Sequence, residues 1–142
     1  MLEAVADRLK SDVPGLGNRV DPVASLSDLL RKNKMPETTT TFVVPLGITG
    51  GKADAMTGLF RQEIRETIGV LLIARSRDRT GEKAIAHLRD LSRQIIDCLV
   101  GWNAGLDLGV FELRRAGVVS MTGGDVIYQV ELSINDQLRI PR

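Results

Sequence analysis

Two neighbouring segments differ in hydrophobic period, and together they predict a strand followed by a packed helix. Residues 64–76 hold a near-continuous apolar run, which is typical of a strand that is covered on both faces or lies in mid-sheet. Over residues 85–99 the apolar positions recur every three or four residues, with charged residues between them, as in an amphipathic helix. Thr80 is placed to cap the start of this helix, and Gly101 is placed to end it. This strand and helix are expected to form the core.

The segment before the central strand combines a strand pattern with a glycine-rich stretch. Residues 38–46 are rich in β-branched side chains and predict a strand. Residues 47–58 then carry four of the 14 glycines. This composition indicates an extended flexible loop or a loose hairpin, and it makes the segment the longest candidate for a mobile part of the chain.

The C-terminal third predicts an antiparallel hairpin. Residues 108–115 indicate a strand that Ala116 and Gly117 would break. Residues 125–135 alternate strictly, so one face of that strand is expected to be buried. The apolar set of this alternation is Val126, Tyr128, Val130, Leu132 and Ile134. Turn chemistry at residues 122–124 would join it to a strand over residues 118–121.

Short elements are expected at the N-terminus. Residues 2–9 have helical spacing, residues 18–23 could form a brief strand, and Ser25 could cap a short helix that runs to Lys32. We therefore expect residues 1–142 to form a single α+β domain. Its sheet would be mostly antiparallel, with about four strands, a long helix packed on one face, and short N-terminal helices.

Composition narrows the class of protein. With 142 residues, 43% hydrophobic content and 26% charged residues, the chain suits one soluble globular domain. A formal net charge of +1 gives no bulk attraction to nucleic acid or to an anionic membrane. One cysteine, Cys98, excludes an intramolecular disulfide. The N-terminal segment lacks a signal-peptide pattern, and no apolar run approaches the ~20 residues of a membrane span. We expect a protein that is made and kept in a reducing cytoplasm, without contact with a membrane.

The candidate enzymatic motifs do not have the residue spacing that their chemistry requires. The stretch GITGGKA from Gly47 resembles a phosphate-binding loop, but only three residues separate its outer glycines and Ala53 follows Lys52 where Ser or Thr is needed. His87 and Cys98 would lie ~16 Å apart along one helix, too far to act together. No metal-ligand spacing occurs. The sequence predicts no catalytic residues, no cofactor and no metal.

The arginines around the central strand admit two interpretations. Arg65, Arg75 and Arg77 have the same parity, so on a strand they would share a face at its two ends. A solvated rim is the commoner explanation for such residues. The alternative is a charged lining where subunits or nucleic acid meet.

The chain from Phe60 onward resembles the tail terminator proteins of long-tailed bacteriophages. The stretches that carry the resemblance are FRQEIRETIGVLLIAR, the helix that runs into LVGWNAG, FELRRAGVV, GGDVIYQVELSIND and, upstream, PETTTTFVVPLG. Leu-x-Gly-Trp, ending at Trp102, is the most specific of these motifs. The sequence departs from the family at Ala104, where a proline is common, and at Arg114 and Arg115, where glycine-rich turns are often found.

The resemblance implies a structural virion protein and not an enzyme. Members of the family form a ring, generally of six subunits, on the head-proximal end of the tail tube. The ring ends polymerisation of the tube and offers a surface for head completion proteins. The implied partners are other copies of the chain, the tail tube protein, a head completion or neck protein and, in a contractile tail, the sheath. DNA would pass through without specific recognition, and the virion would assemble in the host cytoplasm.

Two alternatives stay open. The first is another neck, connector, tail completion or tube protein of the same particle. The second is a small enzyme or ligand-binding domain that uses residues 47–58. Under the structural interpretation we expect an interface with other subunits or with the tube, because apolar groups in an exposed glycine-rich segment need a partner. The candidate interface residues are Ile48, Met56, Leu59, Phe60, Arg65, Arg75 and Arg77.

Overall fold

The computed structural model describes residues 1–21, 31, 38–76, 80–105 and 109–142. Along these residues the elements are α1 (Leu2–Asp12), the 3-10 turn η1 (Pro14–Leu16), β1 (Val20–Asp21), β2 (Thr40–Met56), β3 (Leu59–Arg75), α3 (Glu82–Leu99), β4 (Glu112–Thr122) and β5 (Asp125–Pro141). The predicted α+β class is confirmed. The short helix predicted from Ser25 falls outside the described residues except at Arg31, which is helical.

The sheet differs from the prediction in its number of strands. Five strands pair in the order β1-β2-β3-β5-β4 within the described part of the chain, where about four were expected. The fifth strand is the brief β1, which lies within residues 18–23, where a brief strand was considered possible. It pairs in parallel with β2, so the sheet is mixed. The other pairings are antiparallel. As predicted, β3 is central, and its residues from Ile68 to Ala74 are buried apart from the half-buried Leu71.

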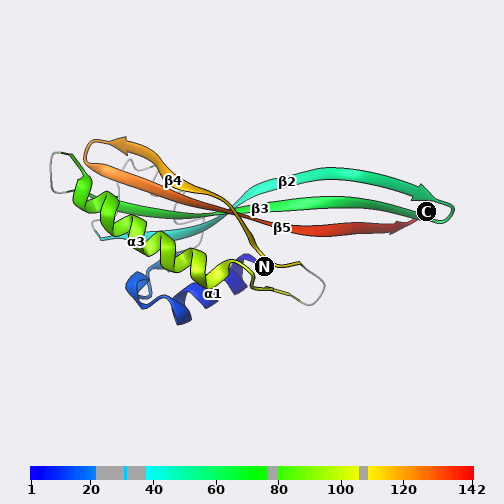
Figure 1. The fold of residues 1–142 in the computed structure, drawn as a ribbon, viewed down its shortest axis with the longest axis horizontal. Helices are drawn as coiled ribbons and strands as arrows, with labels where there is room; N and C mark the ends of the chain where they lie inside the picture. The colour runs from blue at the N-terminus through cyan, green and yellow to red at the C-terminus, as the bar shows by residue number, and fades with distance from the viewer. Residues whose placement is uncertain (22–30, 32–37, 77–79, 106–108) are drawn as a thin grey trace.

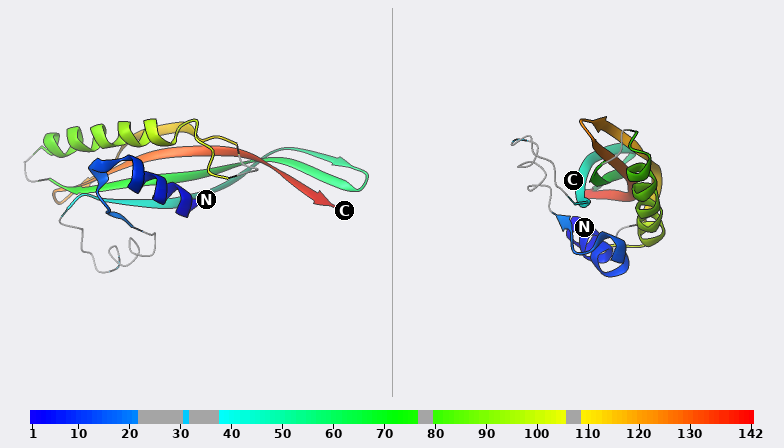
Figure 2. Two further views of the ribbon diagram at one scale, coloured as in Figure 1. Left: turned by 90° about the horizontal axis from the view of Figure 1, so that it is seen from below. Right: turned by 90° about the vertical axis from the view of Figure 1, so that its left-hand side faces the viewer.

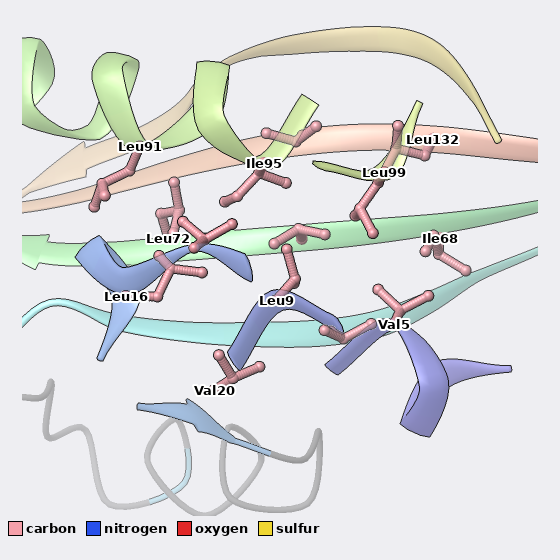
Figure 3. Packing of buried hydrophobic residues seen from close by; sticks show 14 of the residues in the cluster. Val5, Leu9, Leu16, Val20, Ile68, Leu72, Leu91, Ile95, Leu99 and Leu132 are labelled. Atoms are coloured by element: carbon pink, nitrogen blue, oxygen red, sulfur yellow. The ribbon is translucent and has the colours of Figure 1, made fainter. Parts of the chain in front are cut away.

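The main core lies between one face of the sheet and the two described α-helices. Leu88, Leu91, Ile95 and Leu99 of α3 are buried, as the helical spacing predicts. They pack in one cluster with residues of α1 and with the alternate residues of β3 and β5 that face the helices (Figure 3). Val126, Val130, Leu132 and Ile134 are buried, which confirms the predicted face of β5, and Tyr128 is half-buried. Phe42, Val44 and Ile73 form a second buried cluster.

Two details at the ends of α3 refine the prediction. Gly81, not Thr80, occupies the N-cap, with φ of 73°, while the Thr80 hydroxyl accepts a hydrogen bond from the Glu82 N–H at 3.4 Å. Gly101 has the left-handed φ of 80° that was expected after the helix. Its N–H donates to the Phe111 carbonyl at 2.8 Å, so this turn also directs the chain toward β4.

Two interruptions of strands that the sequence predicted are absent from the structure. Residues 47–56, expected to be a flexible loop, continue β2 and pair with β3 as one side of a hairpin. The alternative of a hairpin is therefore correct, with its turn at Thr57 and Gly58. Ala116 and Gly117 lie inside β4, because pairing with Val130 and Gln129 keeps the strand continuous. The predicted β4–β5 hairpin is confirmed, and Gly123 and Gly124 supply two successive positive φ angles of 61° and 86°, as a tight hairpin turn requires.

The molecule has two parts that share the same sheet. At one end, which we call the body, α1 and α3 cover one face of the strands (Figures 1 and 2). Beyond the helices, β2, β3 and β5 continue as a long three-stranded ribbon that ends at the β2–β3 turn and the C-terminus. We call this ribbon the arm and define it as residues 47–56, 59–67 and 134–141, which the strand register places side by side.

Candidate interaction surface

One face of the arm is mainly apolar. Residues that pair directly across neighbouring strands point to the same face, so the register shows which side chains form a row. Ile48, Glu66 and Ile134 form one such row, and Ile134 is buried in the core of the body. The apolar face of the arm therefore continues the sheet face that the helices cover in the body. Its apolar members beyond Ile134 are Ile48, Ala53, Ala55, Phe60, Ile64, Leu138 and Ile140.

The opposite face of the arm is polar. On β3, the alternating residues Arg61, Glu63 and Arg65 are all exposed. Their partners on β5 are also polar and exposed, namely Arg139, Gln137 and Asn135. The Arg65 Nε–H donates to Asn135 Oδ1 at 3.3 Å. The arm is therefore amphipathic, with a face that suits water and a face that does not.

The apolar face has no cover in the monomer. Ile48 is 65% exposed and Leu138 is 36% exposed, whereas Leu132, six residues earlier on the same face of β5, is fully buried. Phe60 and Ile64 are half-buried. Figure 2 shows that neither α1 nor α3 reaches this part of the sheet. A mainly apolar exposed surface of this kind is a typical site of contact with another protein chain.

The β2 edge of the arm is irregular. The pairing of β2 with β3 shifts between Pro45 and Gly47 and again between Gly50 and Ala53. At the second shift the Gln62 Nε2–H donates to the Gly51 carbonyl at 3.3 Å, which holds the irregular backbone in place. Irregularities and proline on an edge strand discourage pairing with foreign strands. The β2 edge of the arm is therefore poorly suited to pairing with a strand of another chain.

The structure separates the seven candidate interface residues. Ile48 and Phe60 lie on the apolar face, while Leu59 pairs with Pro141 at the tip. Met56 ends β2, but its side chain is outside the description, as is all of Arg77. Arg65 lies on the polar face of the arm, and Arg75 is exposed at the far end of β3 in the body. Ten residues of strand separate these two arginines by roughly 33 Å, so their shared parity does not bring them together.

The residues considered for chemistry lie apart from the arm. His87 is exposed on α3. Cys98 is half-buried, and burial raises the pKa of its thiol, an effect that the nearby Arg8 guanidinium opposes. Among the described residues, no three His, Cys, Asp or Glu side chains come together in a way that could hold a metal ion. None of the described helices has the length and apolar content needed to cross a membrane.

Trp102, which follows α3, packs between the helices and the start of β4. Its ring stacks on Phe111 with centroids 6.1 Å apart and an interplanar angle of 24°. The Arg8 guanidinium carbon lies 4.7 Å from the centre of the Trp102 ring, and the Arg8 Nε–H donates to the Cys98 carbonyl at 2.9 Å. These contacts join α1 to the end of α3 and therefore belong to the body.

Sequence reasoning missed the amphipathic arm although its signal was present. Phe60 and Ile64 alternate with Arg61, Glu63 and Arg65, and Leu138 and Ile140 continue the apolar parity of β5. The glycines at residues 47–51 concealed the strand that precedes this pattern. The apolar residues proposed for the interface nevertheless include Ile48 and Phe60 of the apolar face.

A helix-covered body with an uncovered apolar arm is the construction of an assembly protein, whose function lies in its contacts with other chains. Comparison with known protein families shows which kind of assembly protein it is. Residues 1–141 match the family described as "Phage tail terminator protein", and the chain belongs to this family. It is therefore a structural protein of the phage tail and part of the virion, which confirms the resemblance found in the sequence.

Comparison with solved structures finds a protein chain of similar fold. A chain in the structure titled "Virion of native gene transfer agent (GTA) particle" superposes with a TM-score of 0.63 at 15% identity, covering 97% of this chain and 95% of that chain. A second solved chain aligns at 15% identity over 99% of this chain and 92% of its own, but with a TM-score of 0.38, too low to establish a common fold. Comparison with curated proteins gives no match.

Proposed function

We propose that this tail protein forms a closed ring, of six subunits as the family resemblance implies, on the head-proximal end of the tail tube. The ring stops polymerisation of the tube and presents its other side to a head completion or neck protein. In a contractile tail it also meets the sheath. DNA passes through the opening without specific recognition.

The observation that carries this proposal is the uncovered apolar face of the arm. A monomeric chain gains nothing by exposing Ile48 and Leu138 to water, whereas burial of such side chains against another chain is favourable. A closed ring supplies that cover with one contact repeated by symmetry. The ligand-binding alternative depended on a mobile glycine-rich loop, and residues 47–56 are instead paired strand.

The test is a capping assay with polymerising tail tube protein, with the ends viewed by cryo-electron microscopy. Wild-type protein is expected to shorten the tubes and to form a rotationally closed ring at one end. Protein spread along the tube would identify a tube subunit, and an end structure without rotational closure would remove the ring. Either result would overturn the proposal in favour of another component of the neck or tail.

Two neighbouring positions on β2 offer a matched pair of variants. Ile48 lies on the apolar face, and Thr49 pairs with Arg65 on the polar face. Ile48→Asp should abolish capping while the melting temperature stays near that of wild type, because the side chain is already 65% exposed. Thr49→Asp introduces the same charge one residue later and should cap normally. Equal capping by both variants would show that the apolar face of the arm is not the contact.

A further inference from the structure

A second uncovered surface, with a lining of apolar and charged side chains, lies at the other end of the molecule in a groove between α3 and β4. The groove has a volume of about 690 Å³, and its lining includes Ile85 and Ile96 from α3, Ala116 from β4 and Tyr128 from β5. The sheet ends at β4, so this side of the groove is not closed by another strand. The shape is an open trough with a helix as one wall and the edge of the sheet as its floor.

The β4 side of the groove extends the apolar surface. Leu113, Val118 and Met121 pair with Leu132, Tyr128 and Val126, so they lie on the sheet face that carries α3. Because the helix packs nearer to β5 and β3, these three side chains remain 43%, 39% and 49% exposed. The chain therefore has two apolar surfaces that lack cover, and one is a ribbon while the other is a trough.

The two surfaces are comparable in length and carry side chains of opposite charge. The β5 part of the arm, residues 134–141, is about 27 Å long at 3.4 Å per residue, and the stretch of α3 that lines the groove, Glu82 to Ile96, spans about 22 Å at 1.5 Å per residue. Glu66 and Asp136 are the charged residues on the apolar face of the arm. Arg89 and Arg93 line the groove together with Glu82 and Asp90, so the lining has no net charge, and the two arginines are its cations that suit Glu66 and Asp136.

We infer that the arm of one copy lies in the α3–β4 groove of the next copy, head to tail. The arm points away from its own body, so it cannot fill its own groove (Figure 1). A contact between two different surfaces of the same chain is heterologous, and it closes into a ring when the rotation per subunit allows. The inference identifies the pair of surfaces within the proposed ring, and it rests on the proposed function only for ring closure.

The test mixes two variants, each with one surface disabled. Leu138→Asp disables the arm and Val118→Asp disables the groove, and both positions are exposed, so the melting temperature checks that each variant folds. Each variant alone should self-associate at least about tenfold more weakly than wild type, because an unpaired carboxylate would have to be buried. Mixed in equal amounts, they should form a 1:1 heterodimer and nothing larger, since one intact arm meets one intact groove. Analytical ultracentrifugation of the three samples measures this.

Tube-bound protein provides a second readout that does not depend on association in free solution. A photo-crosslinking amino acid at position 138 should react with residues 82–96 or 113–121 of another copy, and Val118→Asp should reduce the yield by about tenfold or more. Isotope labelling of half of the subunits separates contacts between copies from contacts within one.

The outcomes separate the inference from the proposed function. Crosslinks only to the tube protein, or to the arm of another copy, would overturn the inference, as would self-association of the Val118→Asp variant at wild-type strength. If that variant still caps tubes with a closed ring, the function stands and the groove contact is wrong. If the heterodimer forms but wild-type protein does not cap tubes, the contact stands and the proposed function is wrong.

Discussion

The body and the arm share the same strands, but the apolar face of these strands is buried only in the body. Leu132 and Leu138 lie on the same face of β5, and the first is fully buried while the second is 36% exposed. The pattern of alternation is the same in both halves. What differs is the helix layer, which stops partway along the sheet (Figure 2).

A comparison of lengths explains why the layer stops. A strand rises about 3.3 Å per residue, so the 17 residues of β3 span about 56 Å. The 18 residues of α3 span about 27 Å, because a helix rises only 1.5 Å per residue. A helix of similar residue count therefore covers about half of such a strand. The remaining half is left without cover by the helices, and it is this half that we propose another chain covers.

The largest expected difference between the two parts is in stability. Leu132→Ala should lower the free energy of unfolding by about 2–5 kcal/mol, because it leaves a cavity in the core. Leu138→Ala removes the same atoms from an exposed position and should cost less than about 1 kcal/mol. Chemical denaturation of the two variants measures the contrast. Similar losses would mean that the arm is packed in the free chain, and the comparison would fail.

The junction between body and arm is expected to be sensitive to added volume. A Cβ placed on Gly109 would lie 2.9 Å from the Asn135 carbonyl oxygen, so this glycine permits a close approach of the chain to β5. Gly109→Ala should destabilise the protein by about 1–3 kcal/mol, since backbone must move apart. Gly117→Ala is the control, because nothing lies within 4 Å of a Cβ there. Thermal unfolding with equal shifts for both variants would show that the junction is not tight.

The body should also depend on the contacts that join α1 to α3. Arg8→Ala removes the hydrogen bond to the Cys98 carbonyl and the stacking on Trp102, and it should cost about 1–2 kcal/mol. Asp12→Asn removes the 3.5 Å ion pair of Arg8, which is partly exposed, and should cost less. Capping of tubes should be unaffected by either change at temperatures where the protein is folded. A loss of capping by folded Arg8→Ala protein would show that the contact between α1 and the end of α3 also takes part in the interface.

The smallest expected effect concerns Cys98. Because burial raises the pKa of its thiol, less thiolate forms in the folded than in the unfolded chain at the same pH. Iodoacetamide should therefore alkylate the native protein more slowly than the urea-unfolded protein. The linked stability is fully present below the unfolded thiol pKa of about 8.5 and is lost as the pH rises through the folded value. Equal alkylation rates in the two states would show that the thiol is not shielded.

The sequence predicted the body far better than the arm, for a physical reason. Burial imposes clear patterns, so the spacing of Leu88, Leu91 and Ile95 and the alternation around Leu132 were read correctly. In the arm, glycines and two shifts in pairing interrupt β2, and local composition then resembles a loop. This part of β2 is a strand because it pairs with β3. Such pairing is a tertiary effect that the strand propensity of the local sequence does not reveal.

The site was predicted only in part because an interface needs geometry. Apolar residues in a glycine-rich segment predicted contact with a partner, and the structure places two of them, Ile48 and Phe60, on the apolar face of the arm. The strand register shows which face these two residues share. It also shows that Leu138, near the end of the chain, lies on the same face. The arginines show the limit of parity, since Arg65 and Arg75 have equal parity but lie in different parts of the molecule.

The central claim is that another chain covers the apolar face of the arm in the assembled tail. Hydroxyl-radical footprinting of free and tube-bound protein tests it through two neighbouring side chains that are both exposed in the monomer, Ile48 at 65% and Leu46 at 42%. Ile48 lies on the apolar face, whereas Leu46 lies on the opposite face beside Gly69. We predict that assembly sharply lowers the oxidation rate of Ile48 and leaves that of Leu46 nearly unchanged. An unchanged rate at Ile48 in tube-bound protein would contradict the account.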